Sequence, residues 1–171
     1  VASAFSRWTS IGTATVSANR AGQLAEDVNG TNVSANADGS VNLPPDIQPG
    51  ATAQPVAVVY DADGLVVDAL VGQGASDSAF CASYSVLGGP DSLSADAHLA
   101  HALVVLNGNC AQTSAQLPDL QYHLVRTLGE VLGLDWSQVN VNVVTGVPAA
   151  PTAADYAGFS LMHMVDPTYC A

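Results

Sequence analysis

The spacing of apolar residues predicts the longest helix of the chain between residues 117 and 134. In LPDLQYHLVRTLGEVLGL, apolar residues recur every three or four positions, which places them on one face of a helix. Pro118 and Gly133 are residue types typical of a helix start and a helix end, respectively. The residues of the apolar face are Leu117, Leu120, Leu124, Leu128 and Val131.

A shorter helix is predicted at the start of the chain. The segment VASAFSRWTSI places Ala4, Phe5 and Trp8 at helical spacing, so that they share one face. The next segment, TATVSA (13–18), alternates polar and apolar residues and therefore predicts a strand.

Two further segments have the pattern of strands. The sequence PVAVVYDADGLVVDALVG (55–72) predicts two strands joined by a turn at Asp61-Ala-Asp63-Gly64. The sequence HLAHALVVLNGNC (98–110) contains an apolar run from Ala102 to Leu106 that predicts a buried strand.

Long irregular segments separate these elements. Residues 29–55 are rich in Gly, Pro, Asn and Asp and predict a loop that is either functional or packed on the surface. Residues 137–171 are also expected to be mostly irregular. Because there is neither an internal repeat nor a linker, residues 1–171 are expected to form a single domain. The opening VASAFSRW, without methionine, indicates a fragment or processed part of a larger exported protein.

The charge composition excludes several classes of partner. Only 11% of residues are charged, lysine is absent, and the net charge is −12. Nucleic acid is excluded as a partner because no basic patch can form. Anionic membrane surfaces are disfavoured for the same reason, and no apolar run reaches the roughly 18 residues that span a bilayer.

The three cysteines favour an exported protein. Cys81, Cys110 and Cys170 are not spaced as metal ligands, and we expect a disulfide between Cys81 and Cys110, with Cys170 free or paired with chain outside this sequence. The alternative is three unpaired buried thiols in a cytosolic protein. The scarcity of lysine and the abundance of Ser, Thr, Asn and Gly favour an extracellular or cell-surface location.

The segment RTLGEVLGLDWS (126–137) resembles the active-site helix of metzincin zinc peptidases, closest to the matrixin-like branch. That family has H-E-x-G-H-x-x-G-x-x-H-S, and AFSRWTSI, VVLNG and FSLMHMVDP (159–167) resemble its first helix, a strand and its Met-turn, with Met162 as the methionine. The resemblance implies an α/β (α+β) fold: a twisted mixed sheet, two main helices and an irregular C-terminal part. The positions of the active-site segment that match are Gly129, Leu132, Gly133, Leu134, Asp135 and Ser137.

The residues that would perform the chemistry are all replaced. In the family, three histidines hold zinc and a glutamate acts as general base on the bound water. At those positions this chain has Arg126, Thr127, Glu130 and Trp136. Arginine does not deprotonate to bind a metal, and one carboxylate cannot hold zinc alone. The resemblance therefore implies no zinc and no metzincin catalysis.

Arg126 and Glu130 are one helical turn apart and can form an ion pair. We hypothesise that this ion pair replaces zinc as the structural element of the family's metal site. Trp136 would fill the volume left by the metal and its third ligand. The alternative is an ordinary surface ion pair worth a few tenths of a kcal/mol.

Two further groups of residues are candidates for metal binding. His98 and His101 could share a helical face and, with His163, form a rearranged metal site, although a chance pairing is favoured. Asp61, Asp63 and Asp68 are candidate calcium ligands, although D-G is also a strong hairpin signal.

We therefore expect a catalytically inactive metalloprotease-like domain of a bacterial protein, with a structural, adhesive or self-assembly role outside the cell. Its partners would be proteins or copies of itself, because a chain with so few charges exposes uncharged surface. The family has a strand before its first helix, which here would come from upstream sequence or from a neighbouring subunit. The alternative is an active secreted metallopeptidase with a rearranged metal site.

Overall fold

The computed structural model describes residues 1–13, 15–51, 53, 55–135, 145–156 and 160–163. These residues form helices together with a mixed sheet and a small antiparallel one, which confirms the expected mixture of α and β structure. The chain divides into two compact units, residues 1–131 and 132–171, and each is described by itself.

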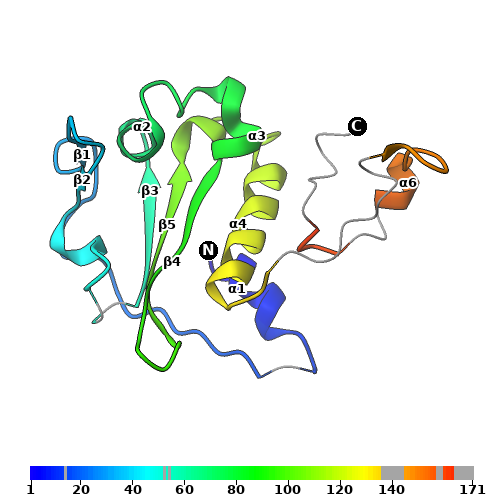
Figure 1. Ribbon diagram of the computed structural model, residues 1–171, viewed down its shortest axis with the longest axis horizontal. Coiled ribbons are helices and arrows are strands. Elements are labelled where there is room, and N and C mark those ends of the chain that lie inside the picture. The colour runs from blue at the N-terminus through cyan, green and yellow to red at the C-terminus, as the bar shows by residue number, and fades with distance from the viewer. Residues whose placement is uncertain (14, 52, 54, 136–144, 157–159, 164–171) are drawn as a thin grey trace. The chain divides into compact units, whose positions relative to one another are not determined.

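A three-stranded mixed sheet forms the centre of the first unit. Its order is β3 (Val56–Asp61), β5 (Leu99–Asn107) and β4 (Val86–Leu93). β5 lies in the middle, parallel to β3 and antiparallel to β4. Seven of its nine residues are buried, as is typical of a central strand covered on both faces. The apolar run predicted as a buried strand is therefore confirmed (Figure 1).

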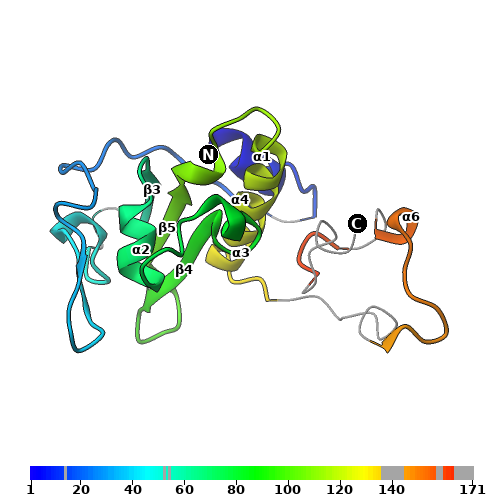
Figure 2. The same cartoon turned by 90° about the horizontal axis from the view of Figure 1, so that it is seen from above.

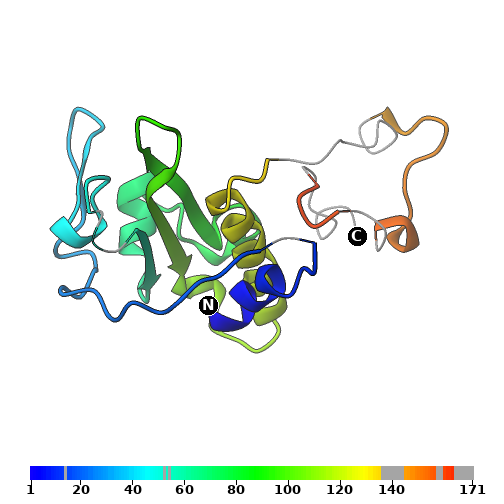
Figure 3. The same ribbon diagram turned by 90° about the horizontal axis from the view of Figure 1, so that it is seen from below.

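Helices cover both faces of this sheet. α2 (Leu65–Val71) packs on one face, and α4 (Leu117–Val131) packs on the other, mainly against β4 (Figure 2). α1 (Ala2–Thr9) lies beside α4 (Figure 3). The two helices predicted from apolar spacing thus form, and Gly133, with φ +85°, follows the end of α4 as expected for a helix stop.

The loop predicted between residues 29 and 55 packs on the face of the sheet that α2 covers. It contains the two-stranded hairpin of β1 (Ser34–Ala35) and β2 (Val41–Asn42), followed by the short helix η1 (Pro45–Ile47). Val33 and Ile47 are buried in the hydrophobic core of that face. The loop therefore contributes to the core rather than extending into solvent.

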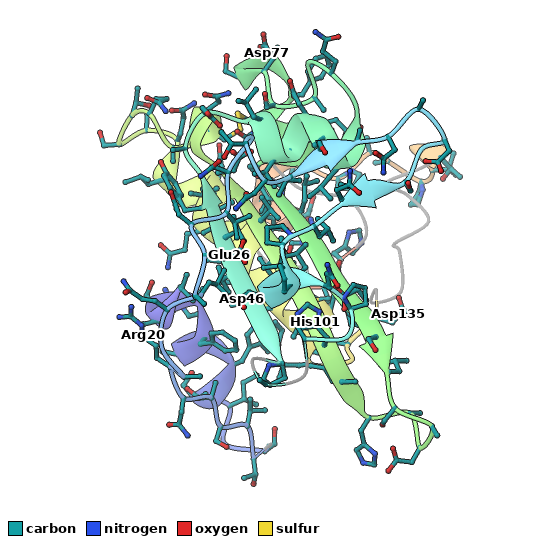
Figure 4. All side chains as sticks on the ribbon, turned by 90° about the vertical axis from the view of Figure 1, so that its left-hand side faces the viewer. Arg20, Glu26, Asp46, Asp77, His101 and Asp135 are labelled. Carbon is teal, nitrogen blue, oxygen red and sulfur yellow. A yellow bond between two sulfur atoms is a disulfide. The ribbon has the colours of Figure 1, made fainter. Side chains whose placement is uncertain are left out.

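One carboxylate holds the preceding segment to this loop. Asp46 of η1 accepts hydrogen bonds from the backbone N–H groups of Ala25 and Glu26, and the side chains of Asp46 and Glu26 are labelled in Figure 4. The segment before Ala25 is exposed for most of its length.

Two strand predictions were wrong. Residues 13 and 15–18 are not part of any strand, although their sequence alternates as a strand does. The second half of the predicted hairpin is helix α2 instead. Asp61 accepts a hydrogen bond from the N–H of Val67, and Gly64 adopts φ +83° before the first helical residue, so the turn leads into a helix. α2 then buries Val66 and Val67 completely.

The remaining described elements are short. η2 (Ser78–Phe80) and α3 (Cys81–Tyr84) precede β4, and η3 (Gly108–Cys110) follows β5. α3 and η3 are joined by the predicted disulfide between Cys81 and Cys110. In the second unit, α6 (Ala153–Tyr156) is a single turn of helix. The expectation of a mostly irregular C-terminal part concerns residues that are only partly described.

Candidate functional site

Helix α4 carries three of the four positions at which the resemblance places zinc chemistry. Arg126 and Thr127 are buried, with 7% and 8% of their surface exposed, and Glu130 is half-buried. Trp136 lies outside the described residues. Arg126 and Thr127 belong to one continuous buried stretch of α4, Leu124 to Gly129, and Glu130 directly follows it.

The environment of Arg126 is partly aromatic. Its guanidinium carbon lies 5.4 Å from the centroid of the Tyr122 ring, within the range of a cation–π interaction. The Tyr122 ring in turn meets the His123 ring edge-on at 5.6 Å. Because Arg126 is buried, the alternative of an ordinary surface ion pair does not describe it. The predicted pairing of Arg126 with Glu130 stays a prediction.

Glu130 lies beside strand β4. A β-carbon added to Gly89 would be 3.9 Å from Oε2 of Glu130. This carboxylate is therefore placed between the helix and the edge strand, in the first unit of the chain.

These side chains do not fit a zinc ion. A guanidinium remains protonated and offers no lone pair, and the neutral hydroxyl of Thr127 cannot take the role of a general base at neutral pH. Of the three described replacements, Arg126, Thr127 and Glu130, only Glu130 has a ligand atom suited to a cation. The buried positive charge of Arg126 would in addition repel a dication placed beside it.

Met162, the methionine of the predicted Met-turn, is buried with 5% of its surface exposed. Its backbone N–H donates to Oγ of Ser160 at 3.3 Å, and the N–H of His163 donates to the Ser160 carbonyl. Most of the segment 159–167 lies outside the described residues, so the Met-turn itself stays a prediction.

The paired histidines do not share a helical face as the sequence suggested, because both lie at the β4–β5 hairpin. The side chain of His98 is 80% exposed and pairs with Asp96 at 2.9 Å. His101 is completely buried on β5, with Nδ1 2.7 Å from Oδ1 of Asp91 (His101 is labelled in Figure 4). The two imidazoles therefore have different surroundings and separate carboxylate partners.

The contact between His101 and Asp91 was missed by the sequence analysis. Asp91 lies where β4 shifts register against β5, between Pro90 and Ser92. Such a bulge redirects a side chain in a way that periodicity alone does not indicate. In the described part of the chain, Nε2 of His101 is buried without a hydrogen-bond partner.

The three aspartates proposed as calcium ligands each accept hydrogen bonds from nearby backbone. Asp61 binds the N–H of Val67, Asp63 that of Leu65 and Asp68 that of Ser76. These contacts stabilise the start of α2 and the turn that follows it. They give each carboxylate a structural role, and calcium binding stays a prediction.

Burial and hydrogen bonding act on these carboxyl groups in opposite directions. Burial raises the pKa of Asp61, which is 1% exposed, against the opposing effect of hydrogen bonds from Val67 and Val66. For Asp68, burial also opposes ionisation, but hydrogen bonds from Ser76 and Gly74 together outweigh it and lower the pKa.

The described residues contain neither a metal-binding cluster nor a membrane-spanning helix. No cluster of three or more His, Cys, Asp or Glu side chains there is arranged to hold a metal ion. No helix there has both the length and the apolar character needed to cross a bilayer. Comparison of the chain with protein-family models, curated proteins and solved structures found no match.

Proposed function

We propose that this chain is a catalytically inactive, metzincin-like domain that serves a structural or self-assembly role outside the cell. The observation that carries the proposal is the burial of Arg126 in α4, at the position where the resemblance places the first zinc ligand. A buried guanidinium needs compensation by neighbouring groups. It is better explained as a structural element than as a remnant of a metal site.

Two further features support a role outside the cell among protein partners. The Cys81–Cys110 disulfide is compatible with an extracellular protein, because such bonds persist in oxidising compartments. Large apolar side chains also remain exposed, among them Tyr60 at 54% and Leu93 at 61%. On a chain with few charges, such side chains favour contact with another protein.

The experiment is a measurement of zinc and of peptidase activity on the same purified chain. We expect zinc far below one ion per chain and no hydrolysis of a broad peptide library, with or without added zinc. Zinc near one ion per chain, together with peptidase activity abolished by a chelator, would overturn the proposal. Substituting His98, His101 or His163 by Ala would then test the alternative of a rearranged metal site.

A matched variant tests whether the degenerate positions are the reason for inactivity. The combined variant Arg126→His, Thr127→Glu, Glu130→His and Trp136→His restores the metzincin ligand set. If the helix retains the family's geometry, this variant binds zinc in a one-to-one ratio while the natural chain does not. Circular dichroism of both chains controls for loss of fold.

A further inference from the structure

The outer edge of β3 has no strand partner among the described residues. β3 is the outermost strand of the order β3-β5-β4 (Figure 1). The N–H of Ala102 donates to the carbonyl of Pro55 at 2.8 Å, so Pro55 and alternate residues after it face β5. The backbone N–H and C=O groups of Val56, Val58 and Tyr60 consequently point to the side opposite β5, where another strand could pair with them.

This edge lacks the features that usually prevent strand addition. Natural edge strands are protected by charges, prolines, bulges or short length. The opposite edge, β4, has such protection: Gly88 and Gly89 have positive φ, Pro90 follows them, and the register then shifts. β3, in contrast, is the regular run VAVVYD without a bulge, and its single charged residue, Asp61, is buried.

The side chains beside the open edge are apolar and incompletely covered. Val56 and Val58 are half-buried, and Tyr60 is 54% exposed, all on the same face of the strand. β-branched and aromatic residues of this kind stabilise cross-strand pairs. An added strand would therefore gain backbone hydrogen bonds and cover apolar surface together.

The same chain contains a segment with the pattern of a strand whose described residues, 13 and 15–18, belong to no strand. TATVSA (13–18) places small or apolar residues at alternate positions. In the structure Thr15, Ser17 and Ala18 are exposed, and Val16 is half-buried. The segment has no charged residue. Its addition to the edge of β3 therefore places no further negative charge next to a chain whose net charge is −12.

We propose that segment 13–18 of one copy of this chain adds as a strand to the outer edge of β3 in a second copy. The contact is heterologous, since donor and acceptor are different surfaces, and it therefore builds closed rings or open chains of copies. β-strand addition supplies the main-chain hydrogen bonds, and the half-covered valines of β3 supply the apolar contact. The inference rests on the proposed structural role and specifies the surfaces that would perform it.

The test uses one variant on each side of the contact. Val58→Pro removes an outward N–H from the acceptor edge, and Val16→Pro removes an N–H from the donor segment. We expect the natural chain to form dimers and larger species as its concentration rises in sedimentation-velocity experiments, and more readily at higher salt because charge repulsion is screened. Each variant alone is expected to stay at the monomer mass of 17.3 kDa.

Mixing the two variants gives a result specific to this arrangement. Val58→Pro retains a working donor and Val16→Pro retains a working acceptor, so the mixture forms one-to-one dimers but no larger species. Leu93→Lys is the matched control, because Leu93 is more exposed than Tyr60 but lies on β4, and it should assemble like the natural chain. Tyr60→Lys replaces Val58→Pro if the proline variant does not fold.

The proposal is overturned if the natural chain stays monomeric at every concentration and salt, or if Val16→Pro assembles normally. It is also overturned if Leu93→Lys abolishes assembly as completely as Tyr60→Lys. These outcomes are separate from those of the zinc assay. A zinc-free monomer contradicts strand addition alone, whereas a zinc-containing, active peptidase that still assembles contradicts the proposed inactivity alone.

Discussion

The indole Nε1 of Trp8 donates a hydrogen bond of 2.8 Å to the backbone oxygen of Val125, connecting residues 117 positions apart. The contact joins α1 to the middle of α4, and Trp8 is buried with 7% of its surface exposed. Its ring therefore contributes apolar burial as well as a polar contact that fixes the two helices relative to each other.

Substitution of Trp8 should separate these two contributions. Trp8→Phe keeps an aromatic ring and removes the donor, so we expect a loss of about 1 kcal/mol in the free energy of unfolding. Trp8→Ala also leaves a cavity and should cost about 3–5 kcal/mol. Urea denaturation measures both, with the exposed Arg7→Ala as control. Equal losses for the two Trp8 variants would show that the ring itself contributes little.

Elements with one dominant periodicity were predictable from the sequence. α4 and β5 have long, consistent apolar patterns, and both form where expected. α2 was missed because LVVDALV is short and β-branched, which suits either structure. Its helical state depends on tertiary context: the carboxylate of Asp61 accepts a hydrogen bond from Val67, and Val66 and Val67 are buried against the sheet.

Gly88 in β4 is a position at which any side chain would be incompatible with the fold. A β-carbon there would lie 1.9 Å from the carbonyl oxygen of Leu103, and the residue has φ +123°. We expect Gly88→Ala to cost at least about 3 kcal/mol, because backbone of the central strand must move. Thermal unfolding followed by circular dichroism measures this loss.

The neighbouring glycine provides the control for Gly88. Gly89 has φ +154°, and the nearest atom to an added β-carbon is Oε2 of Glu130 at 3.9 Å. Gly89→Ala therefore adds backbone strain but no close contact, and it should cost about 1–3 kcal/mol, less than Gly88→Ala. If the two alanine variants melted at the same temperature, the close approach of β4 to β5 would not be the reason that position 88 requires glycine.

The disulfide should contribute measurably to stability. It closes a loop between residues 29 positions apart and connects α3 to η3. The loop-entropy relation gives about 3–4 kcal/mol for a loop of this length. We expect the double variant Cys81→Ser, Cys110→Ser to lose an amount of this order in urea denaturation. Reduction of the natural chain should produce a similar loss, and an unchanged unfolding midpoint after reduction would contradict the expected contribution.

The candidate site was only partly predictable. The resemblance to the metzincin helix singled out Arg126, but the burial of this residue depends on how α4 packs, which periodicity around Leu124 and Leu128 did not specify. The partner of His101 was not predictable, because Asp91 reaches it through a bulge in β4. Local pattern thus located α4 and β5, whereas long-range packing determined the surroundings of their polar residues.

The pH dependence of stability should contain a contribution from Asp61. Burial raises the pKa of this carboxyl above its ordinary value of 3.8. A group with a raised pKa in the folded state stabilises the fold below the unfolded-state pKa, and that contribution is lost as pH rises through the folded-state pKa. Asp61→Asn does not titrate, and its amide oxygen can still accept the hydrogen bond from Val67.

We therefore expect the stability of Asp61→Asn, relative to the natural chain, to increase as the pH rises from below 3.8 to neutral. Urea denaturation at a series of pH values measures this difference. Asp119→Asn, which removes a carboxyl group from an exposed position in the first turn of α4, is the control substitution. A difference for Asp61→Asn that stayed constant or fell with rising pH would mean that burial does not disfavour the ionised Asp61 in the folded chain.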